Sequence, residues 1–244
     1  MRVVSLLPSA TEILHAIGGI DFLVGRSHEC DHPRSIDHLP VLTAQRTRFT
    51  SSGDVHRQVS ALASQGQAAS LYQLDADSLR HLAPDVILTQ DLCEVCSIDL
   101  KAVERIAADI SPRPTIISLN PTTFDDVLDD HLRVGQALAL ERQAGDAVIR
   151  LRGRMARAEE FVNPYTEPPV VGFMEWTDPV FIAGHWTVQL IERAGGAHPL
   201  NPTVPIPGSG AAVGPQQASR HAGKSIAVAP EVFTATRPEW LVIA

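Results

Sequence analysis

The chain opens with an apolar run that leads directly into a helix signal, Val3-Val4-Ser5-Leu6-Leu7-Pro8-Ser9-Ala10-Thr11-Glu12. Val3 to Leu7 is typical of a short buried strand, and Pro8 ends it because proline has no backbone N–H for the strand ladder. Ser9, with Glu12 three residues later, forms a capping-box pattern that predicts a helix with Ser9 at its N-cap. A strand followed at once by a helix is the expected start of an α/β fold.

The same alternation continues through the first half of the chain. Further strands are predicted at Leu23–Gly25, Asp85–Thr89 and Thr115–Leu119, and helices at Asp54–Ser64, Asp75–Leu82 and Leu100–Ile110. Strands separated by helices of this length imply right-handed βαβ units and a parallel sheet. Apart from its one helix, the segment 31–67 is polar and is expected to be irregular.

The middle of the chain has a different character. Residues 122–162 contain no proline, and apolar residues recur there near helical spacing. A continuous helix over this stretch would be about 60 Å long at a rise of 1.5 Å per residue. We expect it to connect an N-terminal lobe, 1–121, to a C-terminal lobe, 163–244; the alternative is two helices with a break near Gly145.

An internal repeat supports two Rossmann-like lobes. Residues 79–88 align with residues 233–242, and both read as a helix, then Pro plus an acid, then an apolar strand. The second lobe also shows strand signals at 170–174 and 181–183 and a helix signal at 186–194. Because the chain stops at Ala244, inside the repeated strand, the second lobe is expected to be incomplete.

Composition excludes several classes of function. The chain has 244 residues, 44% of them apolar, and a formal net charge of -8, which disfavours a nucleic acid partner. Its apolar runs have the length of strands, so no membrane insertion is expected. Met1-Arg2 leaves no room for a signal peptide, which predicts a cytoplasmic protein, or a periplasmic one if a signal has been removed. No dinucleotide or P-loop motif and no GxSxG elbow is present, and we expect no enzymatic activity.

All three cysteines lie in two motifs that follow predicted strands, His28-Glu29-Cys30 and Cys93-Glu94-Val95-Cys96. In open α/β sheets, ligands bind outside the carboxyl ends of the strands, so the motifs are expected to meet there. The three thiols with His28 would complete a tetrahedral zinc set, and the thiols alone could hold an iron–sulfur cluster. Dithiol redox exchange at Cys93 and Cys96 is a third interpretation. The structural alternative is that Cys30 fills the core and the CxxC pair packs a turn.

A second candidate constellation lies in the C-terminal lobe, at Glu175-Trp176 and His185-Trp186. Tryptophan offers a flat apolar surface with one donor, which suits a corrin, a porphyrin or an aromatic ligand. His185 could ligate a metal or donate a hydrogen bond. The alternative is ordinary packing, with Trp186 as the anchor of its helix. At Pro8-Ser9, free helix N–H groups could hold an anion or amide, although simple capping also explains them.

Motifs along nearly the whole chain resemble those of a known family. They are Ser5-Leu6-Leu7-Pro8-Ser9-Ala10-Thr11-Glu12, Ser70-Leu71-Tyr72-Gln73-Leu74-Asp75, Leu82-Ala83-Pro84-Asp85-Val86-Ile87-Leu88-Thr89-Gln90, Phe173-Met174-Glu175-Trp176-Thr177-Asp178-Pro179, Ala183-Gly184-His185-Trp186 and Ala194-Gly195-Gly196. In this order they resemble the class III substrate-binding proteins of ABC importers, which bind cobalamin or iron–siderophores. The resemblance implies two lobes joined by a backbone helix, a ligand held between them and, if the protein is exported, an ABC importer permease as partner. The cysteine motifs look like those of a cytosolic, CxxC-containing subgroup.

The resulting prediction is non-catalytic capture of cobalamin or a similar metal-chelate cofactor in the inter-lobe cleft. One wall is expected to supply Pro8, Ser9, Glu29, Cys30 and Glu94, and the other Glu175, Trp176, His185 and Trp186. The alternative is a cytosolic zinc, iron–sulfur or redox protein on the same scaffold. It would use Cys30, Cys93 and Cys96, with or without His28.

Overall fold

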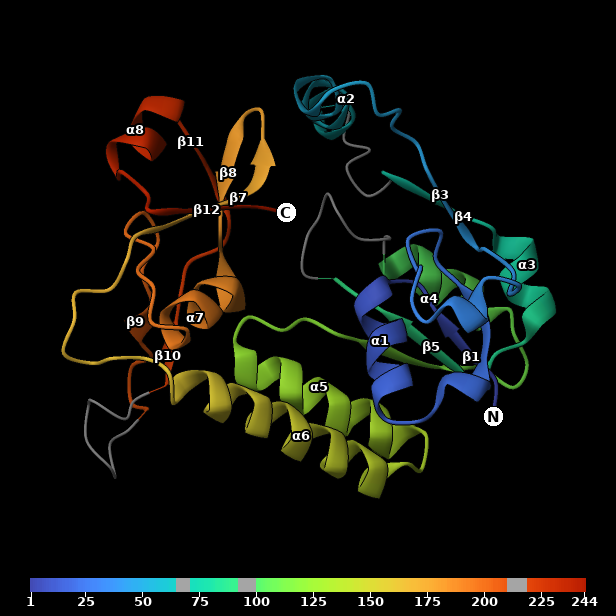
Figure 1. Ribbon diagram of the computed structural model, residues 1–244. Helices are drawn as coiled ribbons and strands as arrows, with labels where there is room; N and C mark the ends of the chain where they lie inside the picture. The colour runs from blue at the N-terminus through green and yellow to red at the C-terminus, as the bar shows by residue number, and fades with distance from the viewer. Residues whose placement is uncertain (65–70, 92–99, 210–218) are drawn as a thin grey trace. The chain divides into compact units, whose positions relative to one another are not determined.

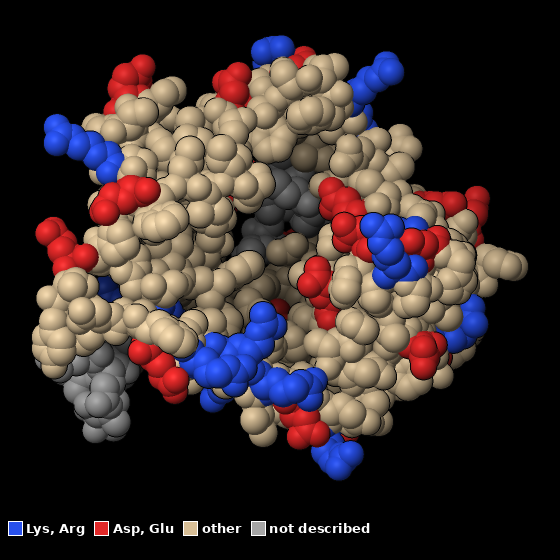
Figure 2. Space-filling view, viewed as in Figure 1, with Lys and Arg blue, Asp and Glu red and all other residues tan. Residues whose placement is uncertain are grey.

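The computed structural model describes residues 1–64, 71–91, 100–209 and 219–244 (Figure 1). The chain divides into two compact units. Unit 1 comprises residues 1–49, 57–120 and 128–149, and unit 2 comprises residues 50–56, 121–127 and 150–244. Acidic and basic side chains are interspersed on the face seen in Figure 2. Within the described ranges, no helix combines the length and the apolar character needed to cross a membrane.

Unit 1 is built on a four-stranded sheet with the order β2-β1-β5-β6. Its strands are β1 (Val3–Ser5), β2 (Leu23–Arg26), β5 (Val86–Thr89) and β6 (Thr115–Ser118). All three strand pairings are parallel, which confirms the sheet predicted from the strand–helix alternation. The helices between these strands are α1 (Pro8–Ala16), α3 (Ala76–Leu82) and α4 (Leu100–Ala108).

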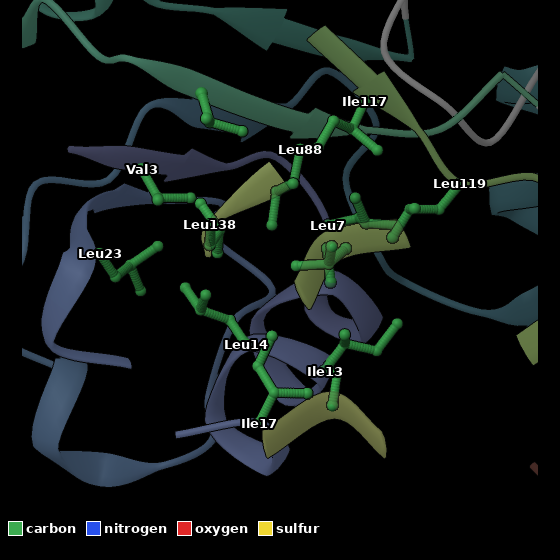
Figure 3. Packing of buried hydrophobic residues seen from close by; sticks show 14 of the residues in the cluster. Val3, Leu7, Ile13, Leu14, Ile17, Leu23, Leu88, Ile117, Leu119 and Leu138 are labelled. Carbon is green, nitrogen blue, oxygen red and sulfur yellow. The ribbon is translucent and has the colours of Figure 1, made fainter. Parts of the chain in front are cut away.

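Helices pack on both faces of this sheet because side chains alternate along each strand. Val3 and Leu88 belong to one buried cluster together with Leu14 of α1. The neighbouring residues Val4 and Ile87 belong to a second cluster, whose helical members are Leu79, Val103, Ala107 and the adjoining Ile110. Figure 3 shows apolar side chains of α1 pointing toward those of the strands. Each fully buried Leu, Ile or Val side chain contributes about 1.5–3 kcal/mol relative to an exposed one.

The first helix begins two residues earlier than predicted. Pro8 is the first helical residue, Leu7 is the N-cap, and no side chain caps the helix. The predicted capping box with Ser9 at the N-cap is therefore wrong. Proline suits the first helical position because its missing N–H would have no intrahelical partner there.

A short strand, β3 (Thr43–Gln45), lies in the region that the sequence predicted to be irregular. It pairs antiparallel with β4 (Tyr72–Leu74). Helix α2 (Ser52–Ser64) follows β3, close to the predicted helix. Short 3-10 turns occur at Ile20–Phe22 and Arg34–Ile36. Strand β3 is too short, and too polar, to give an alternation signal.

The predicted long helix is two helices, α5 (Phe124–Ala137) and α6 (Glu141–Glu159). The break lies at residues 138–140, where Ala139 has a φ of 56°, and not at Gly145. Gly135 explains the close approach after the turn, since a Cβ there would lie 2.4 Å from the Cβ of Ala144. After the turn, α6 runs back beside α5 (Figure 1). A reversal thus replaces the expected continuous strut.

Unit 2 contains a mixed sheet with the order β11-β8-β7-β12. Its strands are β7 (Val171–Thr177), β8 (Val180–Ile182), β11 (Ile226–Val228) and β12 (Trp240–Ile243). Only β7 and β12 pair in parallel, because β8 returns antiparallel beside β7 and also pairs antiparallel with β11. Helices α7 (His185–Arg193) and α8 (Pro230–Ala235) and the short pair β9 (Val204–Pro205) and β10 (Arg220–His221) complete the described part of the unit.

The core of unit 2 is smaller than that of unit 1. One cluster of buried residues holds Val180, Ile182 and Phe233, and a second holds Ala183, Val188 and Ala222. The two clusters draw on β8 and the adjoining Ala183, on helices α7 and α8, and on Ala222, which follows β10. Each unit therefore has its own buried apolar residues.

Candidate functional site

The parallel strands of unit 1 place two predicted motifs at the same edge of the sheet. Pro8 and Ser9 follow β1, and His28, Glu29 and Cys30 follow β2, which pairs with β1. Because carboxyl ends of parallel strands share an edge, these residues lie where open α/β sheets bind ligands. Ser9 is exposed in the first turn of α1.

The hydroxyl groups of Thr43 in β3 and of Ser27, which follows β2, hold His28 in place. The ring Nδ1 lies 2.6 Å from Thr43 Oγ1, and the backbone N–H of His28 donates to the same oxygen at 3.0 Å. Ser27 Oγ lies 3.0 Å from Thr43 Oγ1 and accepts a hydrogen bond from the backbone N–H of Glu29 at 3.3 Å. Ser27 and Thr43 are both buried, so this network is shielded from water.

The Glu29 carboxylate is partly exposed to solvent and lies near the side chains of His28 and Tyr72. The Tyr72 hydroxyl donates to Glu29 Oε1 at 3.3 Å, and His28 Nε2 lies 4.0 Å from the same oxygen. The His28 and Tyr72 rings have centroids 5.4 Å apart. The Glu29 side chain remains 41% exposed. We call His28, Glu29, Thr43 and Tyr72 the Glu29 cluster.

Sequence reasoning identified His28 and Glu29 but missed Thr43 and Tyr72 as members of this cluster. The missing signal is the pairing of β3 with β4, which joins residues about 30 positions apart and leaves no local pattern. Tyr72 is one of only two tyrosines in the chain, which could have drawn attention to it.

Cys30 is buried in the apolar core of unit 1, with 1% of its surface exposed. Its Sγ lies 3.1 Å from Thr11 Oγ1, and burial raises the pKa of the thiol above its ordinary value. A raised thiol pKa disfavours the thiolate that a metal or a redox reaction requires. This environment agrees with the structural alternative for Cys30.

The remaining predicted thiol ligands, Cys93 and Cys96, and the candidate ligand contact Glu94 lie outside the described residues. Among residues 1–64, 71–91, 100–209 and 219–244, no three His, Cys, Asp or Glu side chains are grouped to hold a metal ion. The zinc and iron–sulfur assignments stay predictions from the sequence.

Trp176 in unit 2 uses its indole N–H within the protein. Nε1 donates to the carbonyl oxygen of Ser52 at 3.1 Å and to that of Asp178 at 3.0 Å. Thr177 Oγ1 donates to Ser52 Oγ at 2.9 Å. Trp176 therefore ties the β7–β8 turn to the start of α2, and its donor is not free for a ligand.

Glu175, His185 and Trp186 meet at the start of α7. Glu175 Oε1 accepts a hydrogen bond from the backbone N–H of Gly184, the N-cap residue, at 3.1 Å. A carboxylate at a helix N-terminus is favoured by the helix dipole. His185 has a φ of 49°, and its N–H donates to the carbonyl of Gly223 at 2.8 Å. Trp186 is 36% exposed, so part of this large hydrophobic residue faces solvent.

The sequence predicted that Glu175-Trp176 and His185-Trp186 lie together because each pair follows a predicted strand. The structure brings them together for a different reason. Since β8 runs antiparallel to β7, the ends of the two strands point in opposite directions. The two pairs are joined instead by a hydrogen bond, because Glu175 accepts the N–H of Gly184, the residue that precedes His185.

A cavity of about 250 Å³ in unit 2 is lined by Pro169, Val171, Ile191, Ala194, Gly196 and Trp240. Its lining is apolar and holds no convergent polar side chains. Binding sites for small molecules typically measure about 300–1,000 Å³ and contain a few placed polar groups. This cavity is therefore a weaker candidate than either polar cluster.

A family model for periplasmic binding proteins matches residues 3–242. The chain belongs to the periplasmic binding protein family. No curated protein matches it in sequence. The match spans both lobes and confirms the α/β fold class that the sequence motifs predicted.

Solved structures of periplasmic binding proteins share the fold. The vitamin B12 binding protein of Vibrio cholerae has a TM-score of 0.65 at 16% identity, covering 100% of this chain and 76% of its own. The heme-binding protein of Roseiflexus sp. RS-1 in its apo form has a TM-score of 0.65 at 22% identity, with 99% and 75% covered. The heme-binding protein of Vibrio cholerae has a TM-score of 0.66 at 16% identity, with 100% and 76% covered. At these identities the likeness establishes the fold alone.

Proposed function

We propose that this periplasmic binding protein captures a metal chelate, either cobalamin or a similar tetrapyrrole, without catalysing a reaction. The main support is the family match over residues 3–242. Solved proteins of the same fold carry vitamin B12 or heme in their names. In this chain, two clusters of side chains have the chemistry that such a ligand requires.

Two kinds of side chain in this chain suit such a ligand. Trp186 offers a partly exposed aromatic side chain, on which a flat macrocycle can bury apolar surface. The Glu29 cluster offers a half-exposed carboxylate for the polar periphery of the ligand. Trp176 has a supporting role, since its N–H already bonds the backbone of Ser52 and Asp178.

The proposal has a direct test in ligand titration. Cyanocobalamin and hemin are added separately to the purified full chain, and binding is followed by tryptophan fluorescence and equilibrium dialysis. Trp186→Ala is expected to weaken binding about tenfold or more, because burial of one aromatic side chain is worth about 1.5–3 kcal/mol.

The matched control is Trp240→Ala, which removes another exposed tryptophan, on β12, and is expected to leave affinity unchanged. Failure of both compounds to bind the wild-type protein would overturn the proposed function. Equal losses in the two variants would show that Trp186 is not a specific contact.

Delivery to an ABC importer permease is the partner interaction that this function implies. A structure from Listeria monocytogenes EGD-e, described as an ABC transporter substrate-binding protein, shares the fold with a TM-score of 0.58 at 15% identity. A permease partner requires an exported protein, and a cytoplasmic location would exclude it. Cell fractionation of the native gene product distinguishes the two.

Metal analysis tests the alternative function. Cys30 is buried and its thiol has a raised pKa, so we do not expect it to bind a metal. Replacing Cys30 should therefore leave the zinc and iron content of the anaerobically purified protein unchanged. A stoichiometric metal lost in Cys30→Ser, or a visible iron–sulfur spectrum, would instead support the metalloprotein function.

A further inference from the structure

The hydrogen bonds around His28 hold its ring against Thr43. Thr43 Oγ1 already accepts the backbone N–H of His28, and Ser27 Oγ accepts that of Glu29. The single hydroxyl proton of Thr43 can go to His28 Nδ1 or to Ser27 Oγ.

If Thr43 donates to Ser27, the buried Ser27 hydroxyl is left with no acceptor for its own proton among the described residues. If Thr43 donates to His28 Nδ1, Ser27 donates to Thr43 and both hydroxyl protons are used. In that arrangement neutral His28 carries its proton on Nε2, which also has no partner among the described residues. Each arrangement therefore leaves one buried donor unpaired, and in both of them Thr43 holds His28 through the ring Nδ1 and the backbone N–H.

His28 Nε2 is buried and has no hydrogen-bond partner in the described parts of the chain. Glu29 Oε1 is 4.0 Å away, slightly too far for a hydrogen bond. The same oxygen accepts the Tyr72 hydroxyl at 3.3 Å. The Tyr72 hydroxyl and the His28 ring therefore both lie near one oxygen of the carboxylate.

The second Glu29 oxygen, Oε2, makes no hydrogen bond to any described residue, and the side chain is 41% exposed. An ionised carboxylate only accepts hydrogen bonds, so this oxygen bonds water when no ligand is present, and a donor group of a ligand can replace that water. It lies after β2, at the edge of the sheet where the fold binds ligands.

We propose that Glu29 accepts a hydrogen bond from a carboxamide N–H of the bound ligand, with His28 and Tyr72 as positioning residues. This inference rests on the proposed binding of a tetrapyrrole, and it selects among such ligands. Corrinoids such as cobalamin carry peripheral carboxamides, whereas heme carries propionate carboxylates. A ligand carboxylate beside Glu29 would meet like charge, so the cluster favours a corrinoid over heme.

The experiment compares cyanocobalamin with its monocarboxylic acid derivatives, in each of which one side-chain amide is hydrolysed to a carboxylate. Equilibrium dialysis gives the dissociation constant of each compound for the full chain. We expect one acid to bind the wild-type protein about tenfold or more weakly than cyanocobalamin, because a charge-assisted hydrogen bond is replaced by repulsion.

In Glu29→Gln the penalty for that acid is expected to shrink to about twofold, since glutamine carries no charge and can donate to a carboxylate. His28→Gln retains a donor near Nε2, and so should preserve the wild-type preference better than His28→Ala. A preference between two ligands is a readout that a general loss of stability would not change. Glu104→Gln, an exposed charge change on α4, is the matched control and should behave as wild type.

The inference is overturned if cyanocobalamin binds but every acid shows the same penalty in the wild type and in Glu29→Gln. It is also overturned if hemin binds and cyanocobalamin does not, although tetrapyrrole capture would then stand. If neither compound binds, the inference and the proposed function fail together.

Discussion

Cys30 shows how the surroundings of one side chain decide its chemistry. The residue follows β2 next to His28 and Glu29, yet its thiol belongs to the apolar cluster beneath the sheet edge. Burial raises the pKa of this thiol, and a hydrogen bond with Thr11 only partly opposes the effect. The residue therefore serves packing more readily than ligation.

We expect Cys30 to resist alkylation by iodoacetamide in the folded protein and to react once the protein is unfolded in urea, because it is 1% exposed and its thiolate is disfavoured. Peptide mapping by mass spectrometry separates its reaction from that of Cys93 and Cys96. Rapid labelling of Cys30 under native conditions would contradict this burial.

Gly184 supports the second cluster through its lack of a side chain. A Cβ at this position would lie 2.1 Å from the backbone nitrogen of Ser225. Gly184→Ala is therefore expected to destabilise the protein by about 1–3 kcal/mol or more, as overpacking does. Urea denaturation measures the change.

Gly145→Ala is the matched control, because a Cβ there meets nothing within 4 Å. This glycine lies inside α6, so the alanine variant should be more stable by about 1 kcal/mol. If both variants changed stability in the same direction, the close contact at Gly184 would not be the cause.

Among the helices, α5 is anchored at its start by Asp126. Its Oδ2 accepts the N–H and hydroxyl of Thr122 at 2.9 Å each, and the N–H of Thr123 at 2.7 Å. Thr123 Oγ1 in turn accepts the N–H of Asp126 at 3.1 Å, which completes a reciprocal capping arrangement. Burial alone would raise the pKa of Asp126, but these hydrogen bonds lower it below the ordinary value.

Asp126→Ala is expected to destabilise the protein by about 1 kcal/mol at neutral pH through loss of the cap. Because the folded-state pKa is depressed, this stability is fully present above the unfolded pKa of about 3.9 and is lost as pH falls through the lower folded value. The difference between the two proteins in urea midpoint should therefore vanish only below about pH 4. A constant difference down to pH 2 would contradict the role of the charge.

Across the whole chain, the two units carry separate cores of unequal size. Fully buried Leu14 belongs to the larger core of unit 1, and fully buried Ile182 belongs to the smaller core of unit 2. A protein built in this way need not unfold in a single two-state transition.

Leu14→Ala should destabilise unit 1 by about 2–5 kcal/mol, the usual cost of a cavity in a packed core. Hydrogen exchange with mass spectrometry is expected to show faster exchange in β1, β2 and β5, with β7 and β8 unchanged. Ile182→Ala should produce the reverse pattern. Uniform acceleration across the chain in either variant would show that the units do not open separately.

Much of the architecture was predictable because it depends on local patterns. Strands β1, β2, β5 and β6 and helices α3 and α4 lie within a few residues of their predicted positions. The turn between α5 and α6 was misplaced, since Gly145 looked like the weaker point in the sequence. The packing of Gly135 against Ala144 marks the reversal, and that contact forms only when the helices meet.

The candidate site was predictable only in part. Glu29 and His28 stood out because they follow a strand, but Thr43 and Tyr72 reach them through the long-range pairing of β3 with β4. Trp176 was expected to face a ligand, yet its N–H bonds the backbone of Ser52, which is 124 residues away in sequence. Such partners cannot be inferred from spacing.

From its amino-acid order alone, this protein is an α/β chain with parallel strands in its first half, a charge unsuited to nucleic acid and the motifs of a binding-protein family. The surroundings of each side chain came only from tertiary structure: the buried Cys30 thiol, the occupied Trp176 donor, the half-exposed Glu29 carboxylate and the antiparallel return of β8. The physical reason is that periodicity and turn chemistry act over a few residues. Burial and hydrogen bonding depend instead on residues brought together from distant parts of the chain.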